Sequence, residues 1–207
     1  MSNFAIRRAQ PSDQAAAYHV CLKTGDHGQD GEPFYRDDPD ALGRIFVGPY
    51  LAFEPELSLV LEDELGVCGY GLSALDSRAF YTKYDRDWRP TLCAQFPRPT
   101  GDPATWTRAQ TVHFWYHSPE YFCPEPYEAY PSHMHIDLLQ RARGHGFGRR
   151  IMEQGMHELR RRGSPGAHLC VSALNKPALA FYERLGFQEL ARTGTPTSGS
   201  IYLGKTF

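Results

Sequence analysis

Residues 136–152 read IDLLQRARGHGFGRRIM, and they join a predicted strand to a predicted helix through a turn that contains three glycines. Gly144, Gly146 and Gly148 lack the Cβ atoms that would keep a ligand away from the backbone. The helix that follows presents unpaired N–H groups and the positive end of its dipole at its first turn. A strand, a glycine-rich turn and a helix start, in this order, favour a binding site for a pyrophosphate.

Other phosphate-binding folds use similar glycines, so the surrounding sequence has to decide between them. A dinucleotide-binding fold needs a carboxylate near the end of its second strand. The strand predicted at residues 168–173 is followed instead by Leu174 and Asn175. We therefore expect neither a dinucleotide-binding fold nor a P-loop.

A second informative stretch, NKPALAFYERLGF, occupies residues 175–187 and places Tyr182 seven residues after Asn175. Together with the Arg-x-x-Gly-x-Gly pattern at residues 143–148, this stretch resembles the GNAT superfamily of acetyl-CoA-dependent N-acetyltransferases. The resemblance is specific over residues 132–190 and rests elsewhere on the order of the predicted elements. The run YPSHMHIDLL at residues 130–139 and the residues KTGD at 23–26 are similar to a bacterial group related to the acetyltransferase-like domain of O-GlcNAcase.

The resemblance implies an α/β (α+β) fold with a mixed, mostly antiparallel central sheet of about seven strands flanked by helices. A splayed pair of parallel strands should form the acetyl-CoA cleft. Local patterns predict strands at residues 4–7, 57–61, 67–75, 132–139, 168–173, 188–192 and 200–204. They predict helices at residues 15–22, 77–84, 146–162 and 177–185. We expect one domain, residues 1–207, with a cofactor-binding core at 132–190 and substrate-side insertions at about 24–50 and 76–131.

In this family the strand before the glycine turn binds the cofactor through its backbone, so the resemblance implies contacts from Ile136, Leu138 and Leu139. The remaining residues of the expected acetyl-CoA site are Arg143, Gly144, His145, Gly146, Phe147, Gly148, Arg149, Asn175 and Tyr182. Tyr182 matches the tyrosine that in many relatives protonates the departing thiolate, which is chemistry a phenol can perform. The alternatives are a core aromatic for Tyr182 and a helix cap for Asn175, and the cap is compatible with a cofactor contact.

Three titratable side chains alternate along the strand that should enter the cleft. His133, His135 and Asp137 would face the same side of the sheet. His135 could accept a proton from the attacking amine, directly or through water, with Asp137 orienting or replacing it. The predicted catalytic residues are therefore Tyr182, Asp137 and His135, and the alternative is that the strand residues are structural. Two features depart from the commonest family pattern, because no glutamate stands on this strand and Gln140 replaces the frequent proline.

The acceptor pocket is predicted from composition alone. The polar segment at residues 24–38 could form a substrate loop in which Asp26, Asp30 and Asp37 attract a cationic amine, although such residues are more often a solvated surface. Residues 76–131 are rich in aromatics and include three tryptophans that could be a binding platform or core. These are Trp88, Trp106 and Trp115.

Charge and cysteine content exclude several classes of partner. A net charge of −2 gives no general attraction to nucleic acid or to anionic membranes, so neither is an expected partner. The five cysteines form no Cys-x-x-Cys pair, and we expect reduced thiols, no metal site and a dispensable Cys170. Polar residues follow the N-terminus and no run of 18 apolar residues occurs, which favours a cytoplasmic protein.

The leading hypothesis is therefore an N-acetyltransferase that uses acetyl-CoA and a small-molecule or peptide amine, by direct attack in a ternary complex. An alternative is a non-catalytic CoA-binding module for sensing or protein contact. A nucleotide-binding oxidoreductase is a remote third reading. The identity of the acceptor and the oligomeric state are left open, with a homodimer as one option because dimers are common in the family.

Overall fold

A central sheet runs through the protein, for which a computed structural model describes residues 3–118, 129–195 and 199–207. Within those residues the sheet has seven strands in the order β1-β2-β3-β4-β5-β7-β6. The strands are β1 (Ala5–Arg8), β2 (Ser58–Asp63), β3 (Gly66–Ala74), β4 (Ser132–Leu138), β5 (Gly166–Ser172), β6 (Gln188–Thr193) and β7 (Ser200–Thr206). Every neighbouring pair is antiparallel except β4 and β5, which are parallel. The predicted mixed, mostly antiparallel sheet is confirmed.

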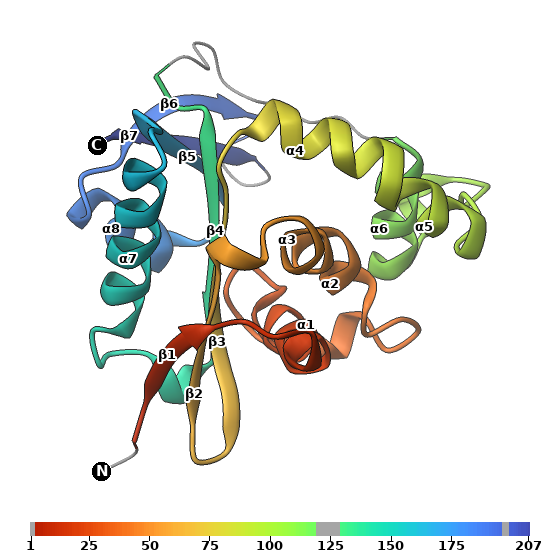
Figure 1. Cartoon of the computed structure of the whole chain (residues 1–207). Coiled ribbons are helices and arrows are strands. Elements are labelled where there is room, and N and C mark those ends of the chain that lie inside the picture. The colour runs from red at the N-terminus through yellow and green to blue at the C-terminus, as the bar shows by residue number, and fades with distance from the viewer. Residues whose placement is uncertain (1–2, 119–128, 196–198) are drawn as a thin grey trace.

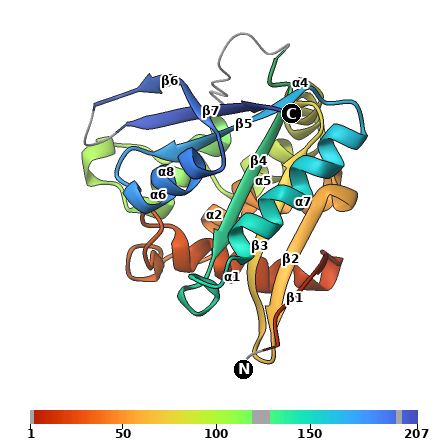
Figure 2. The same ribbon diagram turned by 90° about the vertical axis from the view of Figure 1, so that its left-hand side faces the viewer.

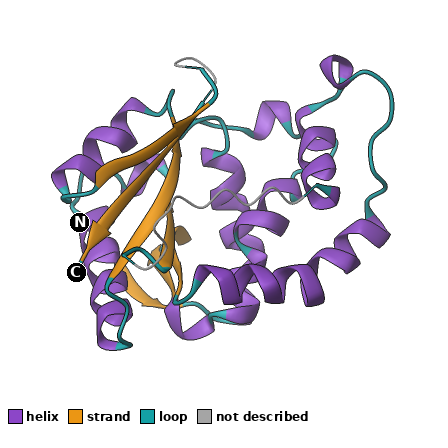
Figure 3. Cartoon of the chain, turned by 90° about the horizontal axis from the view of Figure 1, so that it is seen from above, coloured by secondary structure: helices purple, strands orange, loops and turns teal. Residues whose placement is uncertain are grey.

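Helices cover both faces of this sheet (Figures 1 and 3). On one side lie α7 (Phe147–Arg161) and α8 (Lys176–Arg184). On the other side lie α1 (Gln14–Thr24), α2 (Ala41–Phe46), α3 (Gly48–Phe53), α4 (Ser77–Lys83), α5 (Arg89–Gln95) and α6 (Arg108–His117). Among the described helices, none is long and apolar enough to cross a membrane.

Separate hydrophobic clusters fill the two sides. Tyr18, Val20 and Leu72 belong to the cluster beneath α1, whereas Met152 and Leu169 belong to the cluster beneath α7. The approach of α7 to the sheet is close, because a Cβ atom at Gly71 would clash with the side chain of Ile151. A glycine at this position of β3 is therefore required to seat α7, and with it the turn that precedes α7.

The parallel strands β4 and β5 pair over a short length and then diverge (Figure 2). Their register contains only Ser132 opposite Ala167 and His133 opposite His168. Beyond His133 the edge of β4 that faces β5 has no strand partner among the described residues. The splayed parallel pair expected from the sequence is confirmed, and it leaves backbone hydrogen-bonding groups of β4 open.

The regions between the predicted elements contain more helix than the sequence analysis assigned. The expected helix at residues 77–84 is confirmed as α4, but α2, α3, α5 and α6 were not predicted. The polar segment at 24–38 contains an isolated bridge between Asp26 and Gln29 and a short 3-10 helix, Glu32–Phe34. Cys123, and Tyr121 and Tyr127 of the aromatic region, lie outside the described residues.

Candidate active site

One cleft of about 1090 Å³ runs from the glycine turn, past the open edge of β4, to a group of aromatic side chains under α2, α3 and α6. His133, His135 and Asp137 line it from β4, and Tyr182 lines it from α8. The cleft therefore brings together the predicted cofactor turn and the predicted catalytic residues, of which Tyr182 follows the turn by more than 30 positions. Residues of both predicted insertions contribute to its walls.

The backbone of β4 is open toward the cleft at alternate residues. The Leu139 N–H donates to the Cys68 carbonyl at 2.8 Å, which sets the phase of the β3–β4 ladder. Because hydrogen-bonded and non-hydrogen-bonded pairs alternate in an antiparallel ladder, the N–H and C=O groups of Ile136 and Leu138 point away from β3. The expectation for Leu139 is wrong, because its carbonyl also accepts from the Ala142 N–H at 2.9 Å. Both of its backbone groups are thus used within the protein.

The glycine turn places an open surface before the first turn of α7. Gly144 and Gly146 have φ angles of +81° and +80°, a conformation that costs other residues energy. A Cβ atom built on either glycine has no heavy-atom neighbour within 4 Å, so the space in front of both is open. Together with Gly148 and Arg149, they line the cleft.

Two members of the expected cofactor set turn away from this surface. The rings of His145 and Phe147 lie 5.6 and 4.7 Å, centroid to centroid, from the ring of Phe4. Neither side chain lines the cleft, so the expected contact of both residues with the cofactor rests on their backbone amides alone and stays a prediction. Alternation along the turn explains the result, because the glycines face the cleft while the bulkier residues between them pack outward.

Arg143 and Asn175 hold the rim of the cleft. The Arg143 guanidinium donates to the Leu138 carbonyl at 2.8 Å and to the Gly28 carbonyl at 2.9 Å. Asn175 caps α8 by accepting from the Ala178 N–H at 3.2 Å, as its alternative interpretation predicted. A Cβ atom on Gly28 would lie 2.7 Å from the Asn175 amide nitrogen. The loop at residues 25–31 is therefore tied to both the glycine turn and the start of α8.

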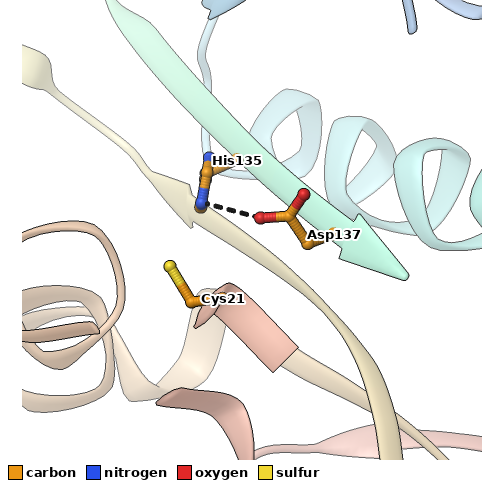
Figure 4. Close-up of side chains that lie close together, drawn as sticks. All are labelled: Cys21, His135 and Asp137. Carbon is orange, nitrogen blue, oxygen red and sulfur yellow. Dashed lines mark ion pairs between the residues drawn. The ribbon is translucent and has the colours of Figure 1, made fainter. Parts of the chain in front are cut away.

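Tyr70 of β3 organises the two polar side chains of β4. Its hydroxyl donates to Asp137 Oδ2 at 2.5 Å and lies 2.9 Å from His135 Nε2, and the latter two atoms are 3.4 Å apart (Figure 4). A phenol has one proton, and Tyr70 gives it to Asp137, so the contact with His135 requires a proton on Nε2. His135 then carries its free lone pair on Nδ1, for which the described residues supply no hydrogen bond.

Burial shifts the pKa values of these groups in opposite directions. Burial lowers the pKa of His135 below its ordinary value, against the opposing effect of the Asp137 charge. Burial raises the pKa of Asp137, against the effects of the His135 charge and of the hydrogen bond from Tyr70. Burial also keeps the Tyr70 phenol protonated by raising its pKa far above the ordinary value. At neutral pH His135 is therefore an uncharged imidazole.

Cys21 of α1 completes this cluster, and sequence reasoning missed both it and Tyr70. One ligand-capable atom each of Cys21, His135 and Asp137 lies within 4.8 Å of the others, which is a spacing that metal sites also show. His135 and Asp137 both hydrogen-bond to the Tyr70 hydroxyl, and burial raises the pKa of the Cys21 thiol. The cluster is thus built around a phenol. In the sequence this cluster is signalled only by Tyr70, a polar aromatic residue within the apolar run at residues 67–75. The register between β3 and β4 is needed to show that Tyr70 stands opposite Asp137.

His133 lies in the cleft wall but belongs to a different network. Its Nδ1 is 2.8 Å from Ser77 Oγ, and its ring stacks on Tyr81 at 5.2 Å and 3°. The Nε2 atom is buried and has no hydrogen-bond partner among the described residues. Burial lowers the pKa of His133 well below its ordinary value. The sequence placed His133 on the same face as His135 and Asp137, and that is confirmed, but the hydrogen bonds join only the latter two.

Tyr182 is buried on α8 at the cleft wall. Burial raises the pKa of its phenol, and the Asp137 and Cys170 charges act in the same direction. The phenol therefore stays protonated at any pH near neutrality. Cys170 lines the cleft from β5 as an exposed free thiol.

The acidic residues of the polar segment do not serve the predicted purpose. Asp26 pairs with Arg108 at 2.6 Å, Asp30 pairs with Lys23, and Asp37 accepts from the Thr107 hydroxyl at 2.7 Å. None of the three lines the cleft, so the hypothesis that they attract a cationic amine is wrong. The segment reaches the cleft through other residues, which are Thr24, Gly25, His27, Gly28 and Tyr35.

Of the three tryptophans, only Trp115 lines the cleft. Its side chain is 40% exposed. Trp88 packs against the core beside α1 and donates to the Arg44 carbonyl at 2.9 Å. Trp106 donates to the Thr100 carbonyl at 3.0 Å.

One stretch of the sequence has the spacing of a P-loop, which the sequence analysis did not consider. Residues 199–206, GSIYLGKT, match the spacing of a P-loop. These residues form β7, whose backbone pairs with β5 and β6 along Ser200–Thr206. An extended strand inside a sheet cannot fold its N–H groups around a phosphate, so the match has no counterpart in the structure.

Comparisons with known proteins agree with this arrangement. The chain is 30% identical over 204 residues to protein O-GlcNAcase of Rattus norvegicus, covering 98% of the chain but only 22% of that protein. A 50-residue part, 24% of the chain and 17% of the relative, is 48% identical to mycothiol acetyltransferase of Thermomonospora curvata. The crystal structure of SsHAT has a TM-score of 0.88 at 36% identity and matches 99% of this chain and 98% of its own. The structure of yncA from Salmonella typhimurium, solved with its cofactor acetyl-CoA, has a TM-score of 0.54 at 14% identity, covers 98% and 93% of the two chains, and shares the fold.

The similarity to O-GlcNAcase expected from the sequence is confirmed, although the chain spans only about a fifth of that curated relative. A model of the acetyltransferase (GNAT) family matches residues 81–187, which is 107 of the 207 residues and includes the glycine turn, β5 and α8. The chain therefore belongs to the GNAT family of acetyltransferases.

Proposed function

We propose that this protein transfers the acetyl group of acetyl-CoA to a primary amine, by direct attack within a ternary complex. The observation that carries the proposal is the single cleft that joins the glycine turn to the His135–Asp137 pair across the open edge of β4. Acetyl-CoA, when bound, supplies a thioester whose acetyl group an amine can accept. Residues 1–207 would act as one domain, because the 132–190 core and both insertions contribute walls to the same cleft.

The residues present fit that cofactor. The backbone N–H groups from Gly144 to Arg149 would bind its pyrophosphate, because the turn leaves open space at the two left-handed glycines and precedes a helix start. The open N–H and C=O groups of Ile136 and the N–H group of Leu138 would bind its extended amide-bearing arm as a further strand of the sheet. Asn175 and Tyr182 would complete the site from α8.

His135 would act as the general base. Its Nδ1 lone pair can take a proton from an attacking ammonium directly or through a water, and the lowered pKa of the half-buried ring keeps that lone pair free at neutral pH. Asp137 and Tyr70 hold the ring through Nε2 and would stabilise the imidazolium that forms. In this scheme Asp137 is a positioning residue, because it acts on the His135 ring together with Tyr70.

Tyr182 would act as the general acid for the departing thiolate. Its phenol lies in the wall of the same cleft and its raised pKa keeps the proton in place until a strong base appears. Cys170 lies nearby, but burial raises the pKa of its thiol, so no covalent enzyme intermediate is proposed.

The test compares His135→Gln and Asp137→Asn with the unaltered protein. Release of free CoA in the presence of an amine should fall by roughly 100-fold or more for His135→Gln, which is the usual range for a lost general base. The Kd for acetyl-CoA, measured by calorimetry, should not change. His157→Gln is the matched control, because that histidine lies on the exposed face of α7 and does not line the cleft. Binding without CoA release for any amine would instead make the protein a non-catalytic CoA-binding module.

A further inference from the structure

The half of the cleft beyond His135 has aromatic walls. Phe46 of α2 and Trp115 of α6 meet edge to face with their centroids 6.4 Å apart, and they are 38% and 40% exposed. The Phe46 ring lies 6.0 Å from the His135 ring, so the wall extends to the proposed base. Tyr35 and Tyr81 continue the lining. Large rings left open beside a reactive imidazole are placed to contact a ligand and are not part of the core.

The charges of the cleft act against a second positive charge on the acceptor. Among the described residues that line it, Asp137 is the one carboxylate, and Tyr70 already holds it. The basic side chains in the lining are Arg108, Arg143, Arg149 and Arg184. Arg108 lies at the aromatic end, paired with Asp26 and 3.9 Å above the Phe34 ring. A polyamine bound at the aromatic end would therefore place its remaining ammonium groups near the Arg108 guanidinium, and the described lining offers no free carboxylate to bind them.

We infer that the acceptor is a primary amine carried by a flat apolar group, such as an arylalkylamine, and is neither a polyamine nor a lysine-rich peptide. The ring of such an amine packs against the exposed surfaces of Phe46 and Trp115, while its short alkyl arm places the nitrogen at His135. Its ammonium form is also attracted to the faces of the aromatic rings before it loses its proton. The inference rests on the proposed function and names the substrate class of the same site.

The experiment measures binding and turnover separately. Phenethylamine, n-propylamine, spermidine and a lysine-rich peptide are titrated by calorimetry into protein saturated with CoA, and the same four are then used in a CoA-release assay with acetyl-CoA. Phenethylamine should bind at least tenfold more tightly than the other three, and its kcat/KM should be at least tenfold higher.

Two tryptophan variants test whether the preference for phenethylamine arises at the aromatic wall of the cleft. Trp115→Ala should reduce the preference for phenethylamine over n-propylamine by roughly tenfold and leave the Kd for acetyl-CoA unchanged. Trp106→Ala removes the same side chain outside the cleft and should change neither quantity.

Tighter binding or faster turnover of spermidine or of the peptide would overturn the inference, as would an unchanged preference in Trp115→Ala. Tight binding of phenethylamine to the CoA complex without turnover would support the ligand class while refuting the proposed transferase activity. The two failures are thus distinguishable.

Discussion

Gly146→Ala isolates the contribution of the glycine turn to cofactor binding. Gly146 caps α7 with φ +80° and lines the cleft, and a Cβ atom there would meet no protein atom within 4 Å. The substitution therefore creates no clash in the free protein. Its cost in stability comes from the left-handed backbone alone, which is about 1–2 kcal/mol for a residue with a Cβ atom. For a chain of this length that lowers Tm by roughly 2–8 °C.

The cost in binding has a different origin. The new methyl group would occupy the space that we assign to the pyrophosphate and would keep it from the N–H groups at the start of α7. Loss of one hydrogen bond to a charged group costs about 1.5–3 kcal/mol. The Kd for acetyl-CoA should therefore rise roughly 10- to 150-fold.

The matched control is Gly163→Ala, at the other end of the same helix. Gly163 has φ +90°, and its Cβ would also meet nothing within 4 Å, but it does not line the cleft. Both variants should lose similar stability in urea unfolding, and only Gly146→Ala should lose affinity in calorimetric titration with acetyl-CoA. Equal affinity in the two variants would refute the assignment of the turn to the pyrophosphate.

Three further predictions concern single side chains. Tyr182→Phe should lower kcat roughly 10- to 100-fold without changing the Kd for acetyl-CoA, and an unchanged kcat would remove Tyr182 from the mechanism. Cys170→Ser should keep the full rate of CoA release, whereas a large loss would revive a covalent route. The pKa of His133 is lowered from 6.5 in the folded state, so below pH 6.5 the unfolded state binds more protons than the folded state. The free energy of unfolding should therefore fall as the pH falls. Between pH 6.5 and 5.5 the free energy of unfolding should fall by about 1 kcal/mol less in His133→Gln than in the unaltered protein, and an equal fall in both would contradict the burial argument.

The elements that the sequence predicted are those with a strong local pattern. The helix that became α7 combines a glycine turn with apolar residues at helical spacing, and it was predicted to within one residue at each end. By contrast α2 and α3 have six residues each, too few for an apolar stripe to be recognised. The longer α6 does carry a readable signal, because Thr107 and Gln110 form a capping box at its start.

The site divides in the same way. The glycine turn and α8 are continuous in sequence, so their motifs could be read directly. The cluster at His135 depends on Tyr70, which stands opposite Asp137 only because of the register between β3 and β4. No local pattern specifies that register, and no pattern showed that the Asp26–Arg108 ion pair neutralises the carboxylate predicted to bind an amine.

His133 and His135 show why alternation along a strand could not identify a base. The Ser77 hydroxyl donates to the Pro131 carbonyl at 2.7 Å, so it accepts from His133 Nδ1–H, and the remaining lone pair on Nε2 is sealed in the protein. In His135 the other ring nitrogen is hydrogen-bonded, because the Tyr70 oxygen accepts from its Nε2–H. Its Nδ1 is left free on a side chain that is 29% exposed. Two histidines on one strand face, both with lowered pKa, thus differ in which nitrogen carries the proton and in whether the other can reach a substrate. The partners on β3 and α4 make that choice, so the general base is a property of the assembled sheet.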